Sequence, residues 1–291
     1  MGEVNEEETR LKKAYGILIS GHPDISFISR DEYLNHSLRT PKLPTATDLT
    51  TPKVPPSYLS VEFSPTPANL YDVTACTYPL ARSGVVTCSI TKHFLLTSKV
   101  GGASRDTYEV FLGPEGCGGL GFDYQPGDSF AVIPENNSDE VNLVLDRLGL
   151  LDTADLATTF RVDPNTTKKA AVVPNHLQNG CSAREILTYA VDFRAKPKKL
   201  FLRALADCCS NSEDQRRLEE LCSREGNEDY AHWYERCLTL IDLLLIFPSC
   251  EPSLGLLLEQ LPRLRPRPYS FTSSPHSQSE ISFMQWSSLN I

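Results

Sequence analysis

Long hydrophobic runs are missing from this sequence of 291 residues. The longest apolar stretch, Leu238 to Phe247, has ten residues and contains Asp242. A helix that crosses a bilayer needs about 20 apolar residues, so this stretch predicts a buried core helix and no membrane association. The acidic residues 1–8 match neither a secretory signal nor a transit peptide. We therefore expect a cytoplasmic protein.

Excess positive charge and clustered metal ligands are lacking as well. Lys and Arg total 28 against 37 Asp and Glu, which gives a net charge of −9 and no basic block that could follow a phosphate backbone. The nine cysteines contain no C-x-x-C pair, and the six histidines lie far apart. These absences argue against a nucleic-acid partner and a zinc site, and they predict reduced thiols.

One glycine-rich motif imitates a nucleotide-binding loop. Residues 116–121 read G-C-G-G-L-G and fit G-x-G-x-x-G. Such a motif binds a dinucleotide where it follows a strand and begins a helix, whose N-terminus holds the phosphates. Residues 122–127 read F-D-Y-Q-P-G and cannot begin a helix. We interpret the motif as a hairpin loop.

Composition and periodicity divide the chain into four parts. Residues 1–75 are expected to be a largely disordered linker, because eight prolines lie between Thr40 and Pro79. Residues 76–180 contain short strand-like runs with short connections, which favour an antiparallel barrel or sandwich. Residues 181–262 have helical periodicity, and residues 263–291 return to strand. The predicted strands cover residues 85–90, 108–112, 129–133, 159–162, 170–173, 263–270 and 279–284.

Helix boundaries are predicted from capping residues. Ser138 and Gly149 would begin and end one helix, and the S-x-x-E box at Ser182 would begin another. Four helices are expected between residues 182 and 247, the last of them a long helix capped by Asn227. A fifth helix is expected to begin at Pro252.

Two short segments contain the candidate ligand-binding residues. Residues 124–136 read Y-Q-P-G-D-S-F-A-V-I-P-E-N, a Pro-Gly turn that leads into a strand. Residues 267–270 read R-P-Y-S, so Arg267 and Tyr269 share one face of a strand and Pro268 is tolerated at its edge. Two interpretations of Arg267 and Tyr269 stay open: a ligand-binding pair, or a solvated arginine beside a core aromatic.

These segments resemble the Y-x-P-G-D…P-x-N and R-x-Y-S-x-x-S motifs of the NADPH-dependent diflavin reductases. The helices between them resemble that family's connecting domain, most closely in the members whose electron acceptor is cobalamin-dependent methionine synthase. The resemblance implies an α+β fold: an incomplete antiparallel flavin barrel of the ferredoxin-reductase type with a helical connecting domain inserted. It covers residues 52–274.

By this resemblance, Arg267, Pro268, Tyr269 and Ser270 would bind FAD. Arg267 would contact the diphosphate, Tyr269 would stack on the flavin, and Ser270 would approach its reactive nitrogen, which requires a local bend of the strand. Lys92 matches a position that faces the NADP phosphates in the family. The family also uses NADPH and FMN domains, which this sequence does not match, so we expect a truncated form without a complete catalytic cycle.

Methionine synthase is the expected partner. The alternatives are a non-enzymatic interaction module, or part of a related diflavin reductase with another acceptor.

Overall fold

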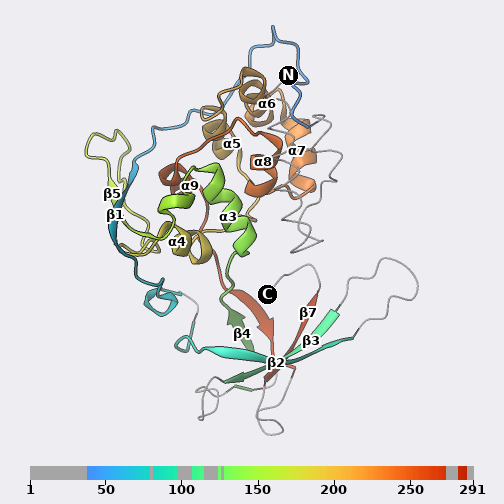
Figure 1. The fold of residues 1–291 in the computed structure, drawn as a ribbon. Coiled ribbons are helices and arrows are strands. Elements are labelled where there is room, and N and C mark those ends of the chain that lie inside the picture. Colours follow the sequence, from blue (N-terminus) through green and yellow to red (C-terminus); the bar gives the residue numbers. More distant parts are fainter. Residues whose placement is uncertain are drawn as a thin grey trace. The chain divides into compact units, whose positions relative to one another are not determined.

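The structure, a computed structural model, describes residues 38–78, 81–96, 107–114, 124–125, 128–272 and 281–286 (Figure 1). Its contacts separate two units. The helical unit contains residues 136–263 together with the described residues 38–71, and the strand unit contains residues 72–135 and 264–291. The boundaries of these units differ from the boundaries predicted at residues 75, 180 and 262. One reason is that the strand at residues 156–162 pairs within the helical unit.

The helical unit is built on leucine-rich helices whose apolar faces meet in one core. Leu145, Leu187, Leu205, Leu221 and Leu244 are each fully buried. Burial of a leucine side chain contributes about 1.5–3 kcal/mol, which makes this core the main source of the unit's stability. The helices are α3 (Ser138–Arg147), α4 (Ala183–Tyr189), α5 (Lys199–Ala206), α6 (Ser212–Cys222), α7 (Asn227–Glu235), α8 (Leu240–Ile246) and α9 (Leu254–Gln260), with a short 3₁₀ turn η2 (Leu151–Thr153).

The predicted caps are mostly displaced by one residue. Asn137 caps α3, where we expected Ser138, and Asn211 rather than the following serine caps α6. Asparagine and serine cap equally well, so the sequence gives no preference between such neighbours. Ser182 caps α4 as predicted and accepts a hydrogen bond from the Glu185 amide, and Gly149 follows α3 with a φ of 67°.

The expected long helix after Asn227 is two helices. Helix α7 ends at Glu235, and Cys237 has a left-handed φ of 56° that a continuous helix excludes. Thr239 and Asp242 then form a reciprocal capping box that begins α8. Residues 182–247 therefore hold five helices where we predicted four.

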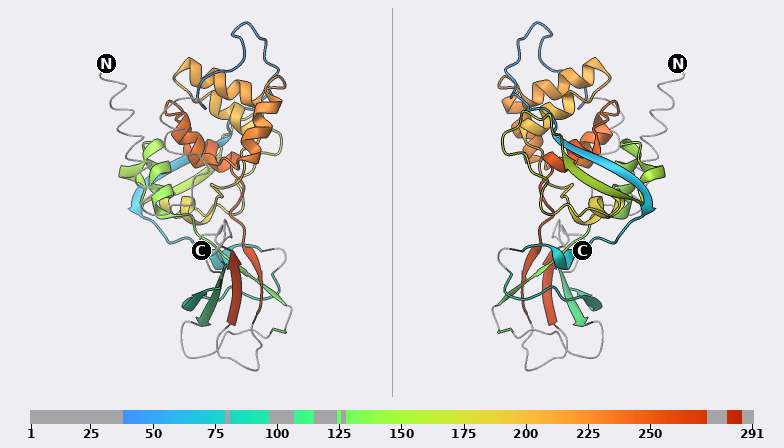
Figure 2. Two further views of the ribbon diagram at one scale, coloured as in Figure 1. Left: turned by 90° about the vertical axis from the view of Figure 1, so that its right-hand side faces the viewer. Right: turned by 90° about the vertical axis from the view of Figure 1, so that its left-hand side faces the viewer.

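A two-stranded antiparallel sheet completes the helical unit. Strand β1 (Leu59–Pro67) pairs with β5 (Leu156–Val162), with Val61 opposite Phe160, and Figure 2 shows the two strands side by side. The strand expected at residues 159–162 is part of β5. The strand expected at residues 170–173 is wrong, because Ala170 has a φ of 56° in a turn and residues 170–173 contain no strand.

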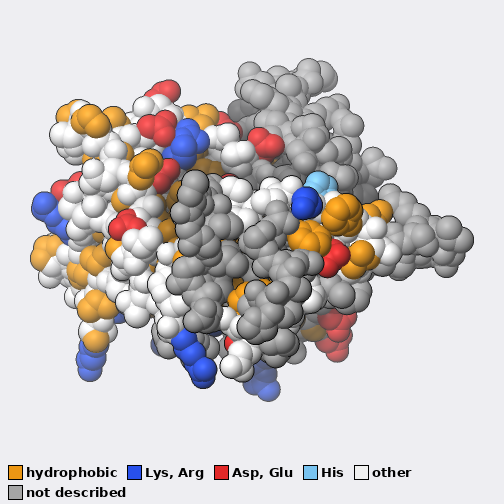
Figure 3. Space-filling model, turned by 90° about the horizontal axis from the view of Figure 1, so that it is seen from below, with side chains coloured by type: hydrophobic (Ala, Val, Ile, Leu, Met, Phe, Trp, Pro, Cys, Tyr) orange, Lys and Arg blue, Asp and Glu red, His pale blue; other side chains and the backbone are white. Residues whose placement is uncertain are grey.

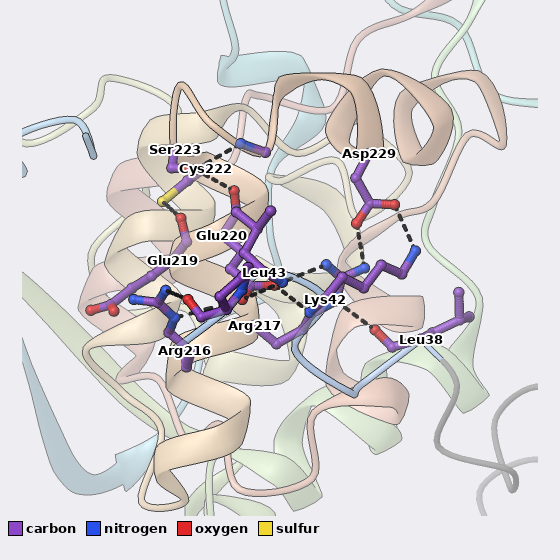
Figure 4. Close-up of polar contacts among 12 residues, drawn as sticks. Leu38, Lys42, Leu43, Arg216, Arg217, Glu219, Glu220, Cys222, Ser223 and Asp229 are labelled. Carbon is purple, nitrogen blue, oxygen red and sulfur yellow. Dashed lines mark hydrogen bonds and ion pairs between the residues drawn. The ribbon is translucent and has the colours of Figure 1, made fainter. Parts of the chain in front are cut away.

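Residues 38–71 are not the loose linker that their prolines suggested. The Glu220 carboxylate accepts hydrogen bonds from the Lys42 and Leu43 amides at 2.8 and 3.1 Å. Arg217 binds the Leu38 carbonyl at 3.0 Å and pairs with Asp229 at 2.5 Å (Figure 4). Proline-rich backbone has few amides, and here two buried side chains of α6, Arg217 and Glu220, bond the Leu38 carbonyl and the amides of Lys42 and Leu43.

The strand unit contains two small antiparallel sheets. One has the order β2 (Cys88–Leu95), β3 (Thr107–Pro114) and β7 (Ile281–Trp286), and the other pairs β4 (Ser129–Val132) with β6 (Arg267–Ser270). A 3₁₀ turn, η1 (Val73–Ala75), precedes them. The mixed helices and short antiparallel sheets agree with the expected class, but the described strands form no closed barrel, so the barrel stays a prediction.

Candidate functional site

The two motif segments, which lie far apart in the sequence, form one antiparallel strand pair. Ser129 lies opposite Ser270, and Val132 lies opposite Arg267. The β4–β6 pair therefore brings the Y-x-P-G-D segment and the R-x-Y-S segment together, as one shared site requires.

Asp128 joins the turn before β4 to the end of β6. Its carboxylate accepts a hydrogen bond from the Gln125 amide at 2.8 Å, and its own amide donates to the Gln125 carbonyl at 2.9 Å. Its carbonyl accepts from the Phe271 amide at 3.1 Å, one residue beyond β6. The aspartate side chain thus fixes the turn, and the backbone carbonyl of the same residue extends the strand pair by one hydrogen bond.

Strand β6 keeps regular alternation. Arg267 is half-buried and Tyr269 is buried on one face, whereas Pro268 and Ser270 are exposed on the other. Arg267 and Tyr269 share a face, as the sequence predicted. The bend that would bring Ser270 to the side of Tyr269 is absent from β6, because all four residues pair in register with β4.

Tyr269 lies in the core of the strand unit. Its ring is 8% exposed and packs in a cluster with Val110. Burial raises the pKa of its phenol, and the Arg267 guanidinium partly offsets that increase. Tyr269 is therefore neutral at physiological pH. Of the two interpretations that the sequence left open, the core aromatic is the one that describes the packing of Tyr269.

Sequence reasoning missed an aromatic stack beside the motif. The Phe271 ring stacks on Tyr124 with centroids 4.0 Å apart and lies 4.7 Å from Phe130. Phe130 also lies 6.0 Å from Tyr269. The available signal was the alternation of Tyr269 and Phe271, which continues the buried face of β6 by two residues.

Other predicted site residues lie elsewhere or outside the described residues. Lys92 is exposed on β2, opposite Phe111, in the three-stranded sheet rather than in the β4–β6 pair. The G-x-G-x-x-G loop at residues 116–121, the Pro-Gly dipeptide at 126–127 and the serines at 273–274 fall outside the residues that the structure describes.

Asn136, the last residue of the first segment, has a structural role in the helical unit. Its side-chain amide donates to the carbonyls of Leu187 and Val191 at 2.7 and 2.6 Å, and its backbone amide donates to Thr188 at 2.8 Å. These carbonyls lie at and beyond the C-terminal end of α4, where helical partners run out. Asn136 therefore satisfies buried acceptors.

The donor set of the strand pair suits FAD in part. The planar guanidinium of Arg267 matches an anionic diphosphate, and the exposed Ser270 hydroxyl can donate or accept a hydrogen bond at the polar edge of a flavin. The buried Tyr269 ring presents little surface for stacking. Arg267 thus fits the cofactor, Ser270 lies on the opposite face of β6, and Tyr269 supports the strand from the core.

Neither a metal cluster nor a membrane span emerges from the described residues. They hold no group of three or more His, Cys, Asp or Glu side chains that could bind a metal ion. They also contain no helix long and apolar enough to cross a membrane. Figure 3 shows a face on which basic and acidic side chains are scattered singly among hydrophobic ones.

Comparison with known proteins agrees with the motifs. A sequence model of the family described as "FAD binding domain" matches residues 92–283. Methionine synthase reductase of Homo sapiens is 50% identical over 154 residues, which are 53% of this chain and 22% of that protein. The Caenorhabditis elegans protein of the same name is 36% identical over 163 residues, 56% of this chain and 24% of that protein.

A second group of relatives shares the same region. Inducible nitric oxide synthase of Homo sapiens is 34% identical over 181 residues, which are 62% of this chain and 15% of that protein. The chain thus spans less than a quarter of the length of each of these relatives.

Proposed function

This chain belongs to the FAD-binding domain family, and on that premise we propose that it is the FAD-binding and connecting part of a reductase of the methionine synthase reductase type. The observation that carries the proposal is the β4–β6 pair, which unites the two flavin motifs in register. The 50% identity to human methionine synthase reductase favours this type of reductase over the nitric oxide synthases, which are 30–34% identical.

FAD, when bound, accepts a hydride and releases electrons singly, and the protein positions it and tunes its environment. Arg267 binds the diphosphate through charge-assisted hydrogen bonds, which are stronger than bonds between neutral groups. Ser270 would hydrogen-bond the polar edge of the flavin only after the end of β6 bends toward the face of Arg267. Tyr269 and the Phe271 stack hold the strand that carries both side chains, and Asp128 fixes the turn that precedes β4.

The proposed physiological role is electron transfer that reactivates cobalamin-dependent methionine synthase, the proposed partner. NADPH would supply the hydride and FMN would pass the electrons on, as the family resemblance implies. Lys92 would face the NADP phosphates in that arrangement, because its ammonium is an exposed point charge.

The direct test is the visible absorption spectrum of the purified chain after FAD is supplied and unbound cofactor is removed. We expect flavin bands at one FAD per chain. A colourless, monodisperse protein would contradict the proposal. If that protein nevertheless bound methionine synthase, it would favour the alternative of a non-enzymatic interaction module.

A matched pair of variants assigns the site. Arg267→Ala removes the diphosphate ligand, and Arg265→Ala removes an exposed arginine two residues earlier. Hydrogen bonds to charged groups contribute about 1.5–3 kcal/mol, so we expect Arg267→Ala to weaken FAD binding by about 10- to 150-fold. Arg265→Ala should leave the affinity within about twofold, since surface changes away from a site rarely exceed ~0.5 kcal/mol. Equal losses in both variants would disprove the role of Arg267.

A further inference from the structure

Two cysteines of the helical unit lie directly opposite each other, and neither belongs to the flavin motifs. Cys209 follows α5 and Cys250 follows α8, and they form an isolated antiparallel bridge. Cys209 is half-buried and Cys250 is 1% exposed. The sulfur atoms of both residues lie 3.5 Å from the same acceptor, the Leu205 carbonyl oxygen.

Backbone hydrogen bonds define the spacing of this pair. The Ser210 amide donates to the Ser249 carbonyl at 3.1 Å, and the Glu251 amide donates to the Cys208 carbonyl at 3.0 Å. These bonds flank the two cysteines, which makes them a non-hydrogen-bonded pair, the type with Cα atoms about 4.5 Å apart and the closer side chains. A disulfide needs Cα atoms roughly 4.4–6.8 Å apart. The backbone is thus already placed for a disulfide, although both thiols are free.

The two thiols differ in reactivity. A side-chain hydrogen bond from Cys250 lowers the pKa of Cys209, and Arg39 and Ser249 lower it further, against burial and the Asp214 carboxylate. The same hydrogen bond raises the pKa of Cys250. Cys209 is therefore the nucleophile of the pair, since the thiolate is the reactive form.

The adjacent Cys208 provides an internal comparison. Burial, Cys209 and Asp207 raise the pKa of its thiol to about 11. Its sulfur lies 3.4 Å from the Ala204 carbonyl oxygen. One of two consecutive cysteines is thus activated and the other is not.

We propose that Cys209 and Cys250 form a redox-sensitive dithiol site, which hydroperoxides convert to a disulfide and cellular thiols reduce again. The site joins the turn after α5 to the turn after α8. It lies outside the FAD motifs and is independent of the function proposed above.

The chemistry balances in two steps. The Cys209 thiolate attacks one oxygen of hydrogen peroxide, the O–O bond breaks, and hydroxide leaves to give a sulfenic acid. The Cys250 sulfur then attacks the Cys209 sulfur, the S–O bond breaks, and the departing hydroxide takes the Cys250 proton to form water. The two sulfurs lose two electrons in total, and the peroxide is reduced.

The test is peptide mapping of the full chain after brief exposure to hydrogen peroxide, with free thiols alkylated before digestion. Trypsin releases residues 204–216 and 237–263, which contain the two cysteines. We expect these peptides to be joined by a disulfide, and fragment ions must distinguish Cys209 from Cys208 and Cys250 from Cys237. A reductant should separate them again. Unlinked peptides, or a bond through Cys208 or Cys237, would overturn the proposal.

Two variants test the order of the steps. In Cys250→Ser, the Cys209 sulfenic acid should persist and react with a sulfenic-acid probe, whereas Cys209→Ser should give neither probe adduct nor disulfide at this site. In the unmodified chain, iodoacetamide should alkylate Cys209 about tenfold faster than Cys208 at pH 8. The pKa of Cys209 is lowered and that of Cys208 is raised to about 11, so the larger thiolate fraction of Cys209 outweighs its lower nucleophilicity.

Cys222→Ser is the matched control. Cys222 is also buried in the helical unit, and burial raises the pKa of its thiol to about 11. This variant should form the disulfide as fast as the unmodified chain. If it abolished the disulfide, or if Cys208 reacted as fast as Cys209, the assignment to Cys209 and Cys250 would be wrong.

Discussion

The two units of this chain bury different kinds of side chain. The helical unit buries charged side chains with specific partners: Asp214 is fully buried, and Arg217 and Glu220 are each 1% exposed. The described core of the strand unit is aromatic, and its β2 strand leaves Ile90 and Phe94 more than half exposed. The flavin motifs belong to the less buried unit, in keeping with the general placement of ligand-binding elements at lower local stability.

The largest loss of stability is expected from a substitution in the charged core of the helical unit. Arg217→Ala removes the ligand of the Leu38 carbonyl and the guanidinium that pairs with the buried Glu220 carboxylate and with Asp229. Loss of one partner of a buried pair costs about 3–5 kcal/mol because the other charge stays buried. Urea unfolding followed by circular dichroism at 222 nm measures this cost. Arg224→Ala, a change of an exposed arginine, should cost less than about 0.5 kcal/mol. Equal costs would contradict the buried network.

The next largest loss of stability is expected from a substitution in the aromatic core of the strand unit. Phe271→Ala removes the ring that stacks on Tyr124 and Phe130, at a cost of about 3 kcal/mol, the low end for a buried aromatic. Hydrogen exchange should accelerate in peptides that contain residues 129–132 and stay unchanged in α6. Phe94→Ala, at a ring that is 53% exposed, is the control and should leave exchange in both regions unchanged. Faster exchange in α6 would contradict the independence of the two units.

A smaller effect tests the contact between α9 and β1. Gly255→Ala would place a Cβ atom 2.2 Å from the Leu59 carbonyl oxygen, so the helix or the strand must shift. Such overpacking costs about 1–3 kcal/mol, and thermal unfolding should show it. Gly84→Ala has no atom within 4 Å of its new Cβ and should not lower the melting temperature. An unchanged melting temperature in Gly255→Ala would place β1 away from α9.

The smallest effect is a pH dependence of the helical unit. Burial, with a lesser contribution from Arg263, lowers the pKa of His176 to about 4. Between pH 4 and 6.5 the unfolded chain therefore binds more protons at this histidine than the folded chain, and stability falls as the pH falls through that window.

Because His176 is partly exposed, we expect its contribution to be on the order of 1–2 kcal/mol. Urea unfolding at pH 6.5 and pH 4.5 should show a smaller difference in His176→Gln than in the unmodified chain. His232→Gln, at an exposed histidine, should keep the full difference. The same difference in all three proteins would exclude His176 as its source.

Local sequence signals predicted much of the fold. Apolar spacing located most helices, and the serine at 182 was correctly identified as a cap. The pairing of β4 with β6 was not predicted: the family motifs indicated only that both segments belong to a flavin domain, and the structure pairs them. The break at Cys237 was missed because a left-handed residue without glycine leaves no sequence signal.

Non-local contacts account for the other errors. The Pro-rich residues 38–67 were interpreted as a linker because their partners, such as Glu220 and Glu259, lie far away in the sequence. Glu259 alone accepts hydrogen bonds from the Ser57 hydroxyl and from the Tyr58 and Leu59 amides. No local pattern in a proline-rich segment predicts such buried acceptors. Likewise, only the fold brings Cys209 opposite Cys250.

The most direct test of the central claim, that the β4–β6 pair forms the FAD site, is hydrogen exchange of the chain with and without FAD. We expect FAD to slow exchange in peptides that contain residues 128–132 and 267–272 and to leave exchange in α5, α6 and α7 unchanged. Protection confined to the helical unit, or no protection in the presence of bound flavin, would contradict it.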